Sequence, residues 1–340
     1  MSEVGVSILC LAFNHEKYIK DTIEGFLMQK TTFPIEIIIN EDCSTDDTAT
    51  IIHEYEKKYP KIIKPIYQKR NVYSQGININ AEYMLPLATG KYVALCDGDD
   101  YWTDPLKLQK QYEVMEANAS CQMCLHRVKE INDKVQTSNE LTIPTNELKT
   151  GIYKSVDFMK FLGEGNFFNE VCYFFRREEY TYYQKNYPKF AEAFMKNKSD
   201  DVPMLLYFGQ LGDIYYINES MAVYRRFTSG SWSEDNKNTG IENYIRFCEN
   251  SIKAYKEYNV FTSDKYAIEL ERWPRYFSFK KAETEKNYKE MILDKYADIF
   301  SKQSNNYQRR IKLQAKFGKP FIWLFQIKDR LNHYKVIEKR

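Results

Sequence analysis

The chain is expected to be an α/β protein in which helices cover both faces of a mostly parallel sheet. Apolar runs of strand length alternate with segments of helical periodicity along its first part, and short loops join them. This alternation predicts parallel strands, because each strand must return to the same edge of the sheet through a crossover helix. Ligands bind such sheets beyond the carboxyl ends of the strands.

The order of the elements follows from these patterns. Residues 4–13 form the first expected strand, and residues 18–29 place Ile19, Ile23 and Phe26 on one helical face. Later strands are expected over residues 35–39, 62–67 and 92–96, and later helices over residues 46–59 and 78–88. From residue 242 onward the pattern becomes helical, with segments near 242–255, 265–282 and 286–300.

The composition narrows the class of protein. The net charge is only +2, from 49 basic and 47 acidic side chains, so nucleic acid is not expected as a partner. The seven cysteines are scattered, which is typical of reduced thiols in a cytoplasmic protein. We expect neither a signal peptide nor a transmembrane helix, since no basic leader precedes the first strand and no apolar run is long enough.

Carboxylates gather where the expected strands end. Asp97, Asp99 and Asp100 follow the fourth strand, and Gly98 lets the backbone turn sharply between them. Glu41 and Asp42 follow the second strand. Hard cations such as Mg²⁺ or Mn²⁺ take oxygen ligands, so the pattern favours a metal–diphosphate site. A solvated acidic turn is the alternative.

Three segments together resemble a known family. They read VSILCLAFNHEKYIKDTIEGFLMQ, EIIINEDCSTDDT and GKYVALCDGDDYW, and a weaker match reads DDVPMLLYFGQLGDIYYINESMAVYRRFTSGSWS. They resemble glycosyltransferase family 2 of the bacterial surface-polysaccharide type, whose GT-A fold is a Rossmann-like αβα sandwich. The resemblance implies a GT-A catalytic domain over residues 1–235 and a helical C-terminal extension over residues 236–340. Within the catalytic domain, residues 1–130 would bind the nucleotide sugar and residues 131–235 would form the acceptor side.

The resemblance also implies site residues and cofactors. Asp99 would ligate Mg²⁺ or Mn²⁺, with Asp97 as a second ligand or a ribose contact. The donor would be a nucleoside diphosphate sugar, with a UDP-sugar favoured. The residues expected to contact it are Ala12, Phe13, Asn14, Glu16, Glu41, Asp42, Arg70, Asn71, Asn80, Asp97, Gly98 and Arg225.

An inverting transferase needs a general base to take the proton of the acceptor hydroxyl. By the resemblance this base is Asp201, with Asp200 as the alternative, at the start of an apolar helix. An Asp in the first turn of a helix is also ordinary capping chemistry. Arg225 or Arg226 would contact phosphate, and the absence of a Gln-x-x-Arg-Trp motif favours the addition of a single sugar.

The end of the chain mixes basic and aromatic residues over 309–330. This composition suits an anionic membrane surface and a lipid-linked glycan acceptor, so we expect a cytoplasmic protein at the inner face of the membrane. The alternative is a helix that packs on the catalytic domain or on a second subunit in a homodimer. Two rival functions stay open: a nucleotidyltransferase of similar architecture, and a catalytically idle protein that binds nucleotide sugars.

Overall fold

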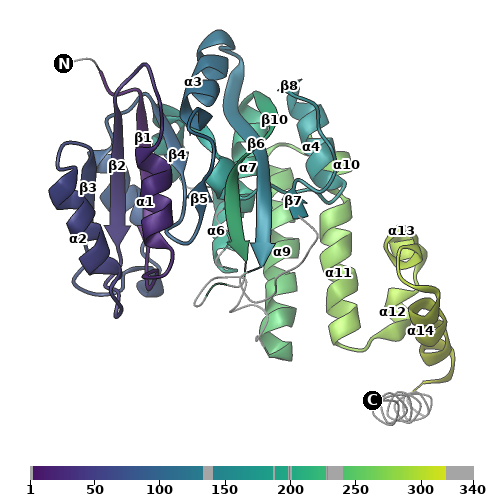
Figure 1. Cartoon of the computed structure of the whole chain (residues 1–340). Helices are drawn as coiled ribbons and strands as arrows, with labels where there is room; N and C mark the ends of the chain where they lie inside the picture. The colour runs from purple at the N-terminus through teal and green to yellow at the C-terminus, as the bar shows by residue number, and fades with distance from the viewer. Residues whose placement is uncertain are drawn as a thin grey trace, which may run out of the picture.

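The computed structural model describes residues 3–132, 141–186, 188–197, 199, 201–226, 228 and 240–318. One twisted sheet crosses the molecule, helices cover it, and a helical C-terminal part lies beyond the strands β6 and β10 (Figure 1). The sheet order is β3-β2-β1-β4-β9-β6-β10-β5, with β7 beside β6 and β8 beside β10.

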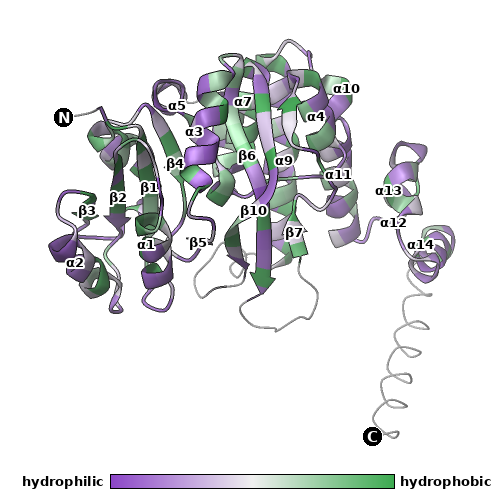
Figure 2. Ribbon diagram, turned by 45° about the horizontal axis from the view of Figure 1, so that its top comes forward, coloured by the Kyte–Doolittle hydropathy of each residue, from purple (hydrophilic) through white to green (hydrophobic). Residues whose placement is uncertain are grey.

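The first four strands of the sheet are parallel. They are β1 (Val6–Ala12), β2 (Ile35–Glu41), β3 (Ile63–Tyr67) and β4 (Tyr92–Leu95). The crossover helices α1 (Ile19–Leu27) and α2 (Thr48–Lys58) follow β1 and β2. Most side chains of β1 and β2 are buried, and Figure 2 shows both strands as largely hydrophobic. The parallel arrangement predicted from these apolar runs is confirmed.

The rest of the sheet is mixed. The strand β9 (Phe174–Arg176) lies antiparallel between β4 and β6 (Cys121–Asn132), and β10 (Asp213–Arg226) runs parallel to β6. Three short strands pair antiparallel at the margins: β5 (Tyr101–Trp102) and β8 (Gly151–Tyr153) on β10, and β7 (Leu141–Ile143) on β6. The predicted class holds, although antiparallel pairs join the parallel core.

The remaining helices before residue 235 continue the same layers. They are α3 (Lys107–Ala117), α4 (Ser155–Gly163), α5 (Arg177–Lys185), α6 (Lys189–Met195) and α7 (Asp201–Leu211), with short 3₁₀ turns η1 (Tyr73–Gln75) and η4 (Glu170–Cys172).

The segment 78–88 differs from the expected α-helix. It forms a π-helical turn, η2 (Asn80–Met84), followed directly by a 3₁₀ turn, η3 (Leu85–Leu87). Pro86 has no N–H, and in an α-helix its ring would collide with the carbonyl of Glu82. The backbone therefore changes its hydrogen-bond spacing on both sides of this proline.

The C-terminal part is helical, as expected. It comprises α9 (Ile241–Phe261), α10 (Ala267–Leu270), α11 (Arg272–Thr284), α12 (Tyr288–Met291), η5 (Asp294–Tyr296), α13 (Ala297–Ser301) and α14 (Asn305–Phe317). The helix α9 joins the main core through Tyr255 and Tyr258, whereas α11 to α14 enclose a second, smaller core that includes Phe279 and Ile311. None of the described helices is both long and apolar enough to cross a membrane. Of the basic and aromatic segment expected over 309–330, residues 309–317 belong to α14, and residues 319–330 lie outside the described residues.

Candidate active site at the carboxyl edge of the sheet

The acidic turn follows β4 directly and packs against the end of β1. The backbone N–H of Gly98 donates to the carbonyl of Leu11 at 2.8 Å. A Cβ atom at Gly98 would lie 2.7 Å from the Nδ1 atom of His15 and 3.1 Å from the same carbonyl. Glycine is favoured here because the turn packs closely on β1 and His15, whereas the sequence predicted it for a sharp turn.

The carbonyls of this turn are held from two sides. From α1, the Thr22 hydroxyl lies 2.6 Å from the carbonyl of Asp100 and 3.0 Å from that of Gly98. From β10, Nη1 of Arg225 donates to the carbonyl of Asp99 at 2.9 Å. The turn is thereby fixed between the first helix and the last long strand.

Arg225 has partners other than the phosphate contact that the sequence suggested. Its Nη2 donates to Asp21 at 2.6 Å, and its guanidinium lies 4.3 Å from the ring centre of Tyr101 and 5.1 Å from that of Tyr18. Only 8% of the residue is exposed. In this structure Arg225 braces the acidic turn. Arg226 is more exposed and pairs with Glu130 at 3.2 Å.

The three carboxylates of the turn lie in different surroundings. Asp100 is 2% exposed and accepts the backbone N–H of Arg225 at 2.8 Å, and burial, followed by the charge of Asp99, raises its pKa. Asp99 accepts a 2.6 Å hydrogen bond from the Thr228 hydroxyl at Oδ2. Burial, the largest effect, together with the charges of Asp99 and Asp201 raises the pKa of Asp97 to about 6, against the opposing effect of a hydrogen bond to Glu170.

Asp201 reaches this cluster from the first residue of α7. Its Oδ1 accepts hydrogen bonds from the Ser199 hydroxyl at 2.7 Å and from the Val202 N–H at 2.8 Å, so the capping role is real. Burial raises its pKa. The Tyr173 hydroxyl lies 3.2 Å from the carbonyl of Asp201 and 3.0 Å from that of Phe168, just before η4. Asp200 lies outside the described residues.

Glu170 and Thr228 were not singled out from the sequence. Glu170 begins η4, and its side chain is hydrogen-bonded to Asp97. Thr228 follows β10 and contacts Asp99. Neither residue stands in a pattern with the acidic turn, since 73 and 129 positions separate each pair; only the folded chain brings them together.

The loops after β1 and β2 bind each other on the donor side of the site. Asn14 has a left-handed backbone, with φ of 56°, and its N–H donates to Ser44 Oγ at 3.0 Å. Its side-chain oxygen accepts the N–H of Thr45 at 2.8 Å. Glu16 accepts the N–H of Asp47 at 3.2 Å. The expected donor residues Asn14 and Glu16 thus tie two neighbouring loops together.

The buried carboxylates after β2 also shape loops. Asp42 is 3% exposed and accepts the backbone N–H groups of Val72 and Tyr73 at 2.8 and 3.0 Å. Glu41 accepts the N–H of Ser44 at 2.6 Å. Ala12 is buried and its carbonyl accepts the N–H of Asp42 at 2.9 Å, whereas Phe13 is 37% exposed.

The loop after β3 carries the other three expected donor residues. Gln68 donates its N–H to the carbonyl of Glu41 at 2.9 Å, which places the start of this loop at the same edge of the sheet. Arg70 is exposed, and the Asn71 side chain accepts the N–H of Ser74 at 2.7 Å. Asn80 is half-buried at the start of η2.

The carboxylates of the acidic turn suit a divalent cation that takes its remaining ligands from a substrate and from water. The described residues contain no group of three or more His, Cys, Asp or Glu side chains able to hold a metal ion. Asp97 and Asp99 therefore supply at most two carboxylates. Mg²⁺ is commonly held in this way, by one or two carboxylates together with substrate phosphates and water.

Comparison with known proteins identifies the family. The sequence model for "Glycosyl transferase family 2" matches residues 7–197, more than half of the chain. The chain belongs to this family. The family resemblance inferred from the three sequence segments is thereby confirmed, and the matched range contains the acidic turn.

This family 2 chain spans only part of the length of the curated relatives that it matches. An uncharacterized protein of Mycobacterium tuberculosis is 34% identical over 227 residues, which are 67% of this chain and 60% of that protein. The putative teichuronic acid biosynthesis glycosyltransferase TuaG of Bacillus subtilis is 38% identical over 32% of this chain and 41% of its own length. The glucosyltransferase WfaP of Escherichia coli is 39% identical over 33% of this chain and 41% of its own.

Solved structures support the GT-A fold of this family 2 chain. Residues 1–349 of TarS from S. aureus, in complex with UDP-GlcNAc, align with a TM-score of 0.52 at 15% identity and cover 92% of this chain and 79% of that one. The mannosyltransferase PcManGT from Pyrobaculum calidifontis, in complex with GDP-Man and Mn²⁺, aligns with a TM-score of 0.50 at 13% identity, over 98% of this chain and 82% of that one. At such identities the likeness concerns the fold alone.

Proposed function

We propose that this chain is a metal-dependent, inverting glycosyltransferase that moves one sugar from a UDP-sugar to a hydroxyl of a saccharide acceptor. The observation that carries the proposal is that Asp99 and Asp201 both lie near enough to Asp97 for their charges to raise its pKa. A carboxylate pair for a metal and a separate carboxylate for a proton are the two requirements of this chemistry.

Each of the loops described above would contact a different part of the nucleotide-sugar donor. The nucleotide would lie over the loops that carry Ala12, Phe13, Asn14 and Glu16, with Asp42 and the loop of Arg70 and Asn71 beside it. Glu41, Asn80 and Gly98 shape the same surface. Asp99 and Asp97 would hold Mg²⁺ or Mn²⁺, which when bound stabilises the negative charge of the departing diphosphate.

The acceptor side depends on Asp201. One oxygen of its carboxylate is occupied by the Ser199 hydroxyl and the Val202 N–H. Its raised pKa, caused by burial, makes it a stronger base than an exposed Asp. It would accept the proton of the acceptor hydroxyl as that oxygen attacks the sugar carbon. Inversion at that carbon follows from a single displacement.

The relatives support a role in surface polysaccharide assembly, of the capsule or O-antigen kind. TuaG is named for teichuronic acid biosynthesis, and WfaP for transfer of glucose from UDP-Glc to a diphosphoundecaprenol-linked sugar. We therefore propose a lipid-linked glycan acceptor and a position at the inner face of the membrane. Residues 1–235 would form the catalytic domain, and residues 236–340 the helical part that meets the membrane or a second subunit.

Calorimetric titration with UDP, GDP, CMP and dTDP, with and without Mn²⁺, tests the proposal. We expect UDP to bind in the presence of Mn²⁺ and to lose this metal-dependent affinity in Asp99→Ala. If another nucleotide binds with the same metal dependence, the donor class changes and the metal site stands. If no nucleotide shows metal-dependent binding, the proposed function is wrong.

A further inference from the structure

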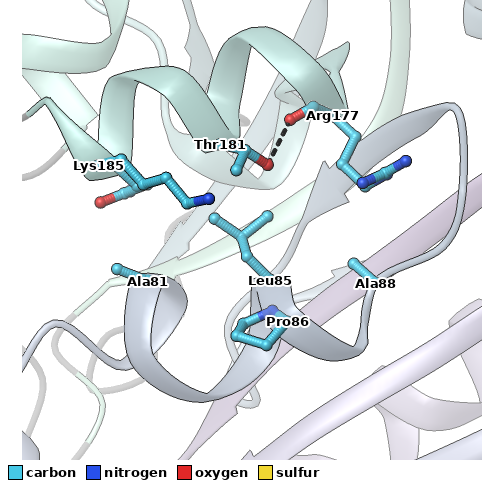
Figure 3. Close-up of a pocket in the computed structure, with 8 residues that line it drawn as sticks. Ala81, Leu85, Pro86, Ala88, Arg177, Thr181 and Lys185 are labelled. Atoms are coloured by element: carbon cyan, nitrogen blue, oxygen red, sulfur yellow. Dashed lines mark hydrogen bonds between the residues drawn. The ribbon is translucent and has the colours of Figure 1, made fainter.

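A cavity lies away from the acidic turn, between α5 and the short helices η2 and η3 (Figure 3). Its volume is about 330 Å³, within the range of small-molecule sites. One wall is apolar and comes from η2, η3 and the residue after them: Ala81, Leu85, Pro86 and Ala88. The other wall is polar and comes from α5: Arg177, Thr181, Gln184 and Lys185.

The polar wall carries two cations and no acidic side chain lines the cavity. Figure 3 shows Arg177 and Lys185 at opposite ends of α5, with Thr181 between them. The Nε atom of Arg177 donates to the carbonyl of Gly90 at 2.7 Å. Neither cation forms an ion pair with any residue in the described ranges. An anionic ligand would supply the missing negative charge.

Gln184 adds a polar group whose hydrogen-bonding capacity is half used. It is 5% exposed, and its Oε1 accepts the Asn78 amide at 2.6 Å. Its buried Nε2 has no hydrogen-bond partner among the described residues. A buried donor without a partner costs about 1–3 kcal/mol, so a ligand that brings an acceptor to this wall gains that amount.

We propose that this cavity binds a small molecule with a phosphate group and an apolar part. A phosphate offers three acceptor oxygens, enough for an ammonium group and an amide together. Lys185 and Gln184 provide these donors as neighbouring residues of α5, while the Thr181 hydroxyl already donates to the carbonyl of Arg177 at 2.8 Å. The apolar part lies against Leu85 and its neighbours, which cannot pair with an anion.

The site is connected to the proposed donor loops, and this step rests on the proposed function. The Asn78 side chain donates to Gln184 and accepts the N–H of Ala81 at 3.1 Å, so its two contacts hold the short segment that contains Asn80. A ligand that fixes Gln184 therefore also fixes the segment expected to contact the donor. By linkage, the ligand and UDP then change each other's affinity by the same factor.

The test measures binding of n-butyl phosphate and of inorganic phosphate, without UDP and with EDTA present, by calorimetry at constant ionic strength. Wild type and Asp99→Asn are expected to bind n-butyl phosphate saturably and more tightly than inorganic phosphate. Lys185→Gln removes an exposed cation without a described partner, and Ala81→Phe fills the cavity without a change of charge. Each is expected to weaken binding at least tenfold.

Lys189→Gln is the matched control, since Lys189 is exposed on the next helix and does not line the cavity. It should bind like wild type. The proposal is overturned if binding is absent, if Lys185→Gln binds as tightly as Lys189→Gln, or if Asp99→Asn alone abolishes it. Because no UDP is present, these outcomes do not depend on the proposed function. A second titration with UDP and Mn²⁺, with and without n-butyl phosphate, measures the coupling.

Discussion

The guanidinium of Arg225 donates a 2.9 Å hydrogen bond to the backbone carbonyl of Asp99, a residue 126 positions earlier in the chain. The same side chain pairs with Asp21 and lies against the rings of Tyr18 and Tyr101. The geometry of the acidic turn therefore depends on the end of β10 as well as on β4.

Arg225→Met tests this dependence. Methionine keeps an apolar chain against the rings but leaves the Asp99 carbonyl and the Asp21 carboxylate without their donor. We expect the free energy of unfolding in urea to fall by about 2–4 kcal/mol and metal-dependent UDP affinity to fall at least tenfold. Arg226→Met is the control, because the partly exposed pair with Glu130 should contribute less than about 1 kcal/mol. Equal effects of the two substitutions would contradict the bracing role.

Asp97→Asn should make the metal-free protein more stable at neutral pH. The folded-state pKa of Asp97 is raised from 3.8 to about 6, so ionisation of this group costs stability above that range. The wild type therefore loses stability as the pH rises from about 4 to about 6. We expect the variant to be about 1–3 kcal/mol more stable at pH 8 and equal to wild type below about pH 4.

Urea unfolding in EDTA at several pH values measures this difference. Asp294→Asn, which removes an exposed carboxylate of the C-terminal part, controls for net charge. A difference between Asp97→Asn and wild type that stays constant from pH 4 to pH 8 would rule out the explanation.

Asp201→Asn separates catalysis from helix capping. An amide can still accept the Val202 N–H but cannot take a proton from an acceptor hydroxyl. We expect kcat to fall by about 10²–10⁴-fold, with UDP affinity within about threefold of wild type. Asp157→Asn, in the first turn of α4, is the matched control and should leave kcat unchanged. If the variant loses stability but keeps its kcat, Asp201 stabilises the start of α7 and is not the general base.

Asp42→Asn should loosen the loop after β3. Its carboxylate accepts two backbone N–H groups, and an amide side chain can accept from only one oxygen. We expect a loss of about 1–3 kcal/mol in stability and a several-fold rise in the KM for the donor, with kcat less affected. Steady-state kinetics and urea unfolding measure both. Asp47→Asn, an exposed neighbour, should change neither.

The parallel half of the fold was predictable because its strands are buried on both faces, so continuous apolar runs such as Ile37 to Ile39 mark them. The acidic turn and its glycine were equally visible, since one short segment holds them. The strand β9 was not predicted, because three residues form too short a pattern to recognise. A helix was correctly expected over 78–88, but it was expected to be an α-helix. It consists of a π-helical and a 3₁₀ turn, because Pro86 lies inside an otherwise helical pattern.

The contacts of the site that could not be predicted from the sequence are those between residues far apart in the chain. Nothing beside Glu170 in the sequence indicates that its side chain is hydrogen-bonded to Asp97, and nothing beside Arg225 indicates that it donates to the carbonyl of Asp99. A buried Asp42 likewise gives no local sign that it accepts the N–H groups of Val72 and Tyr73. Such contacts depend on the packing of distant elements, which residue patterns do not encode.

The place of β10 in the sheet has a consequence for how the chain folds as it is synthesised. The strand β5 follows the acidic turn at once, yet the strand it pairs with is β10, more than a hundred residues later. When only the first 200 residues have left the ribosome, the strands β1 to β4 can pair. The acidic turn then still lacks its hydrogen bond from Arg225. The turn acquires its final shape late, and closure over so long a loop is intrinsically slow. The nascent chain therefore cannot bind a donor in the finished geometry until β10 has been inserted beside β6.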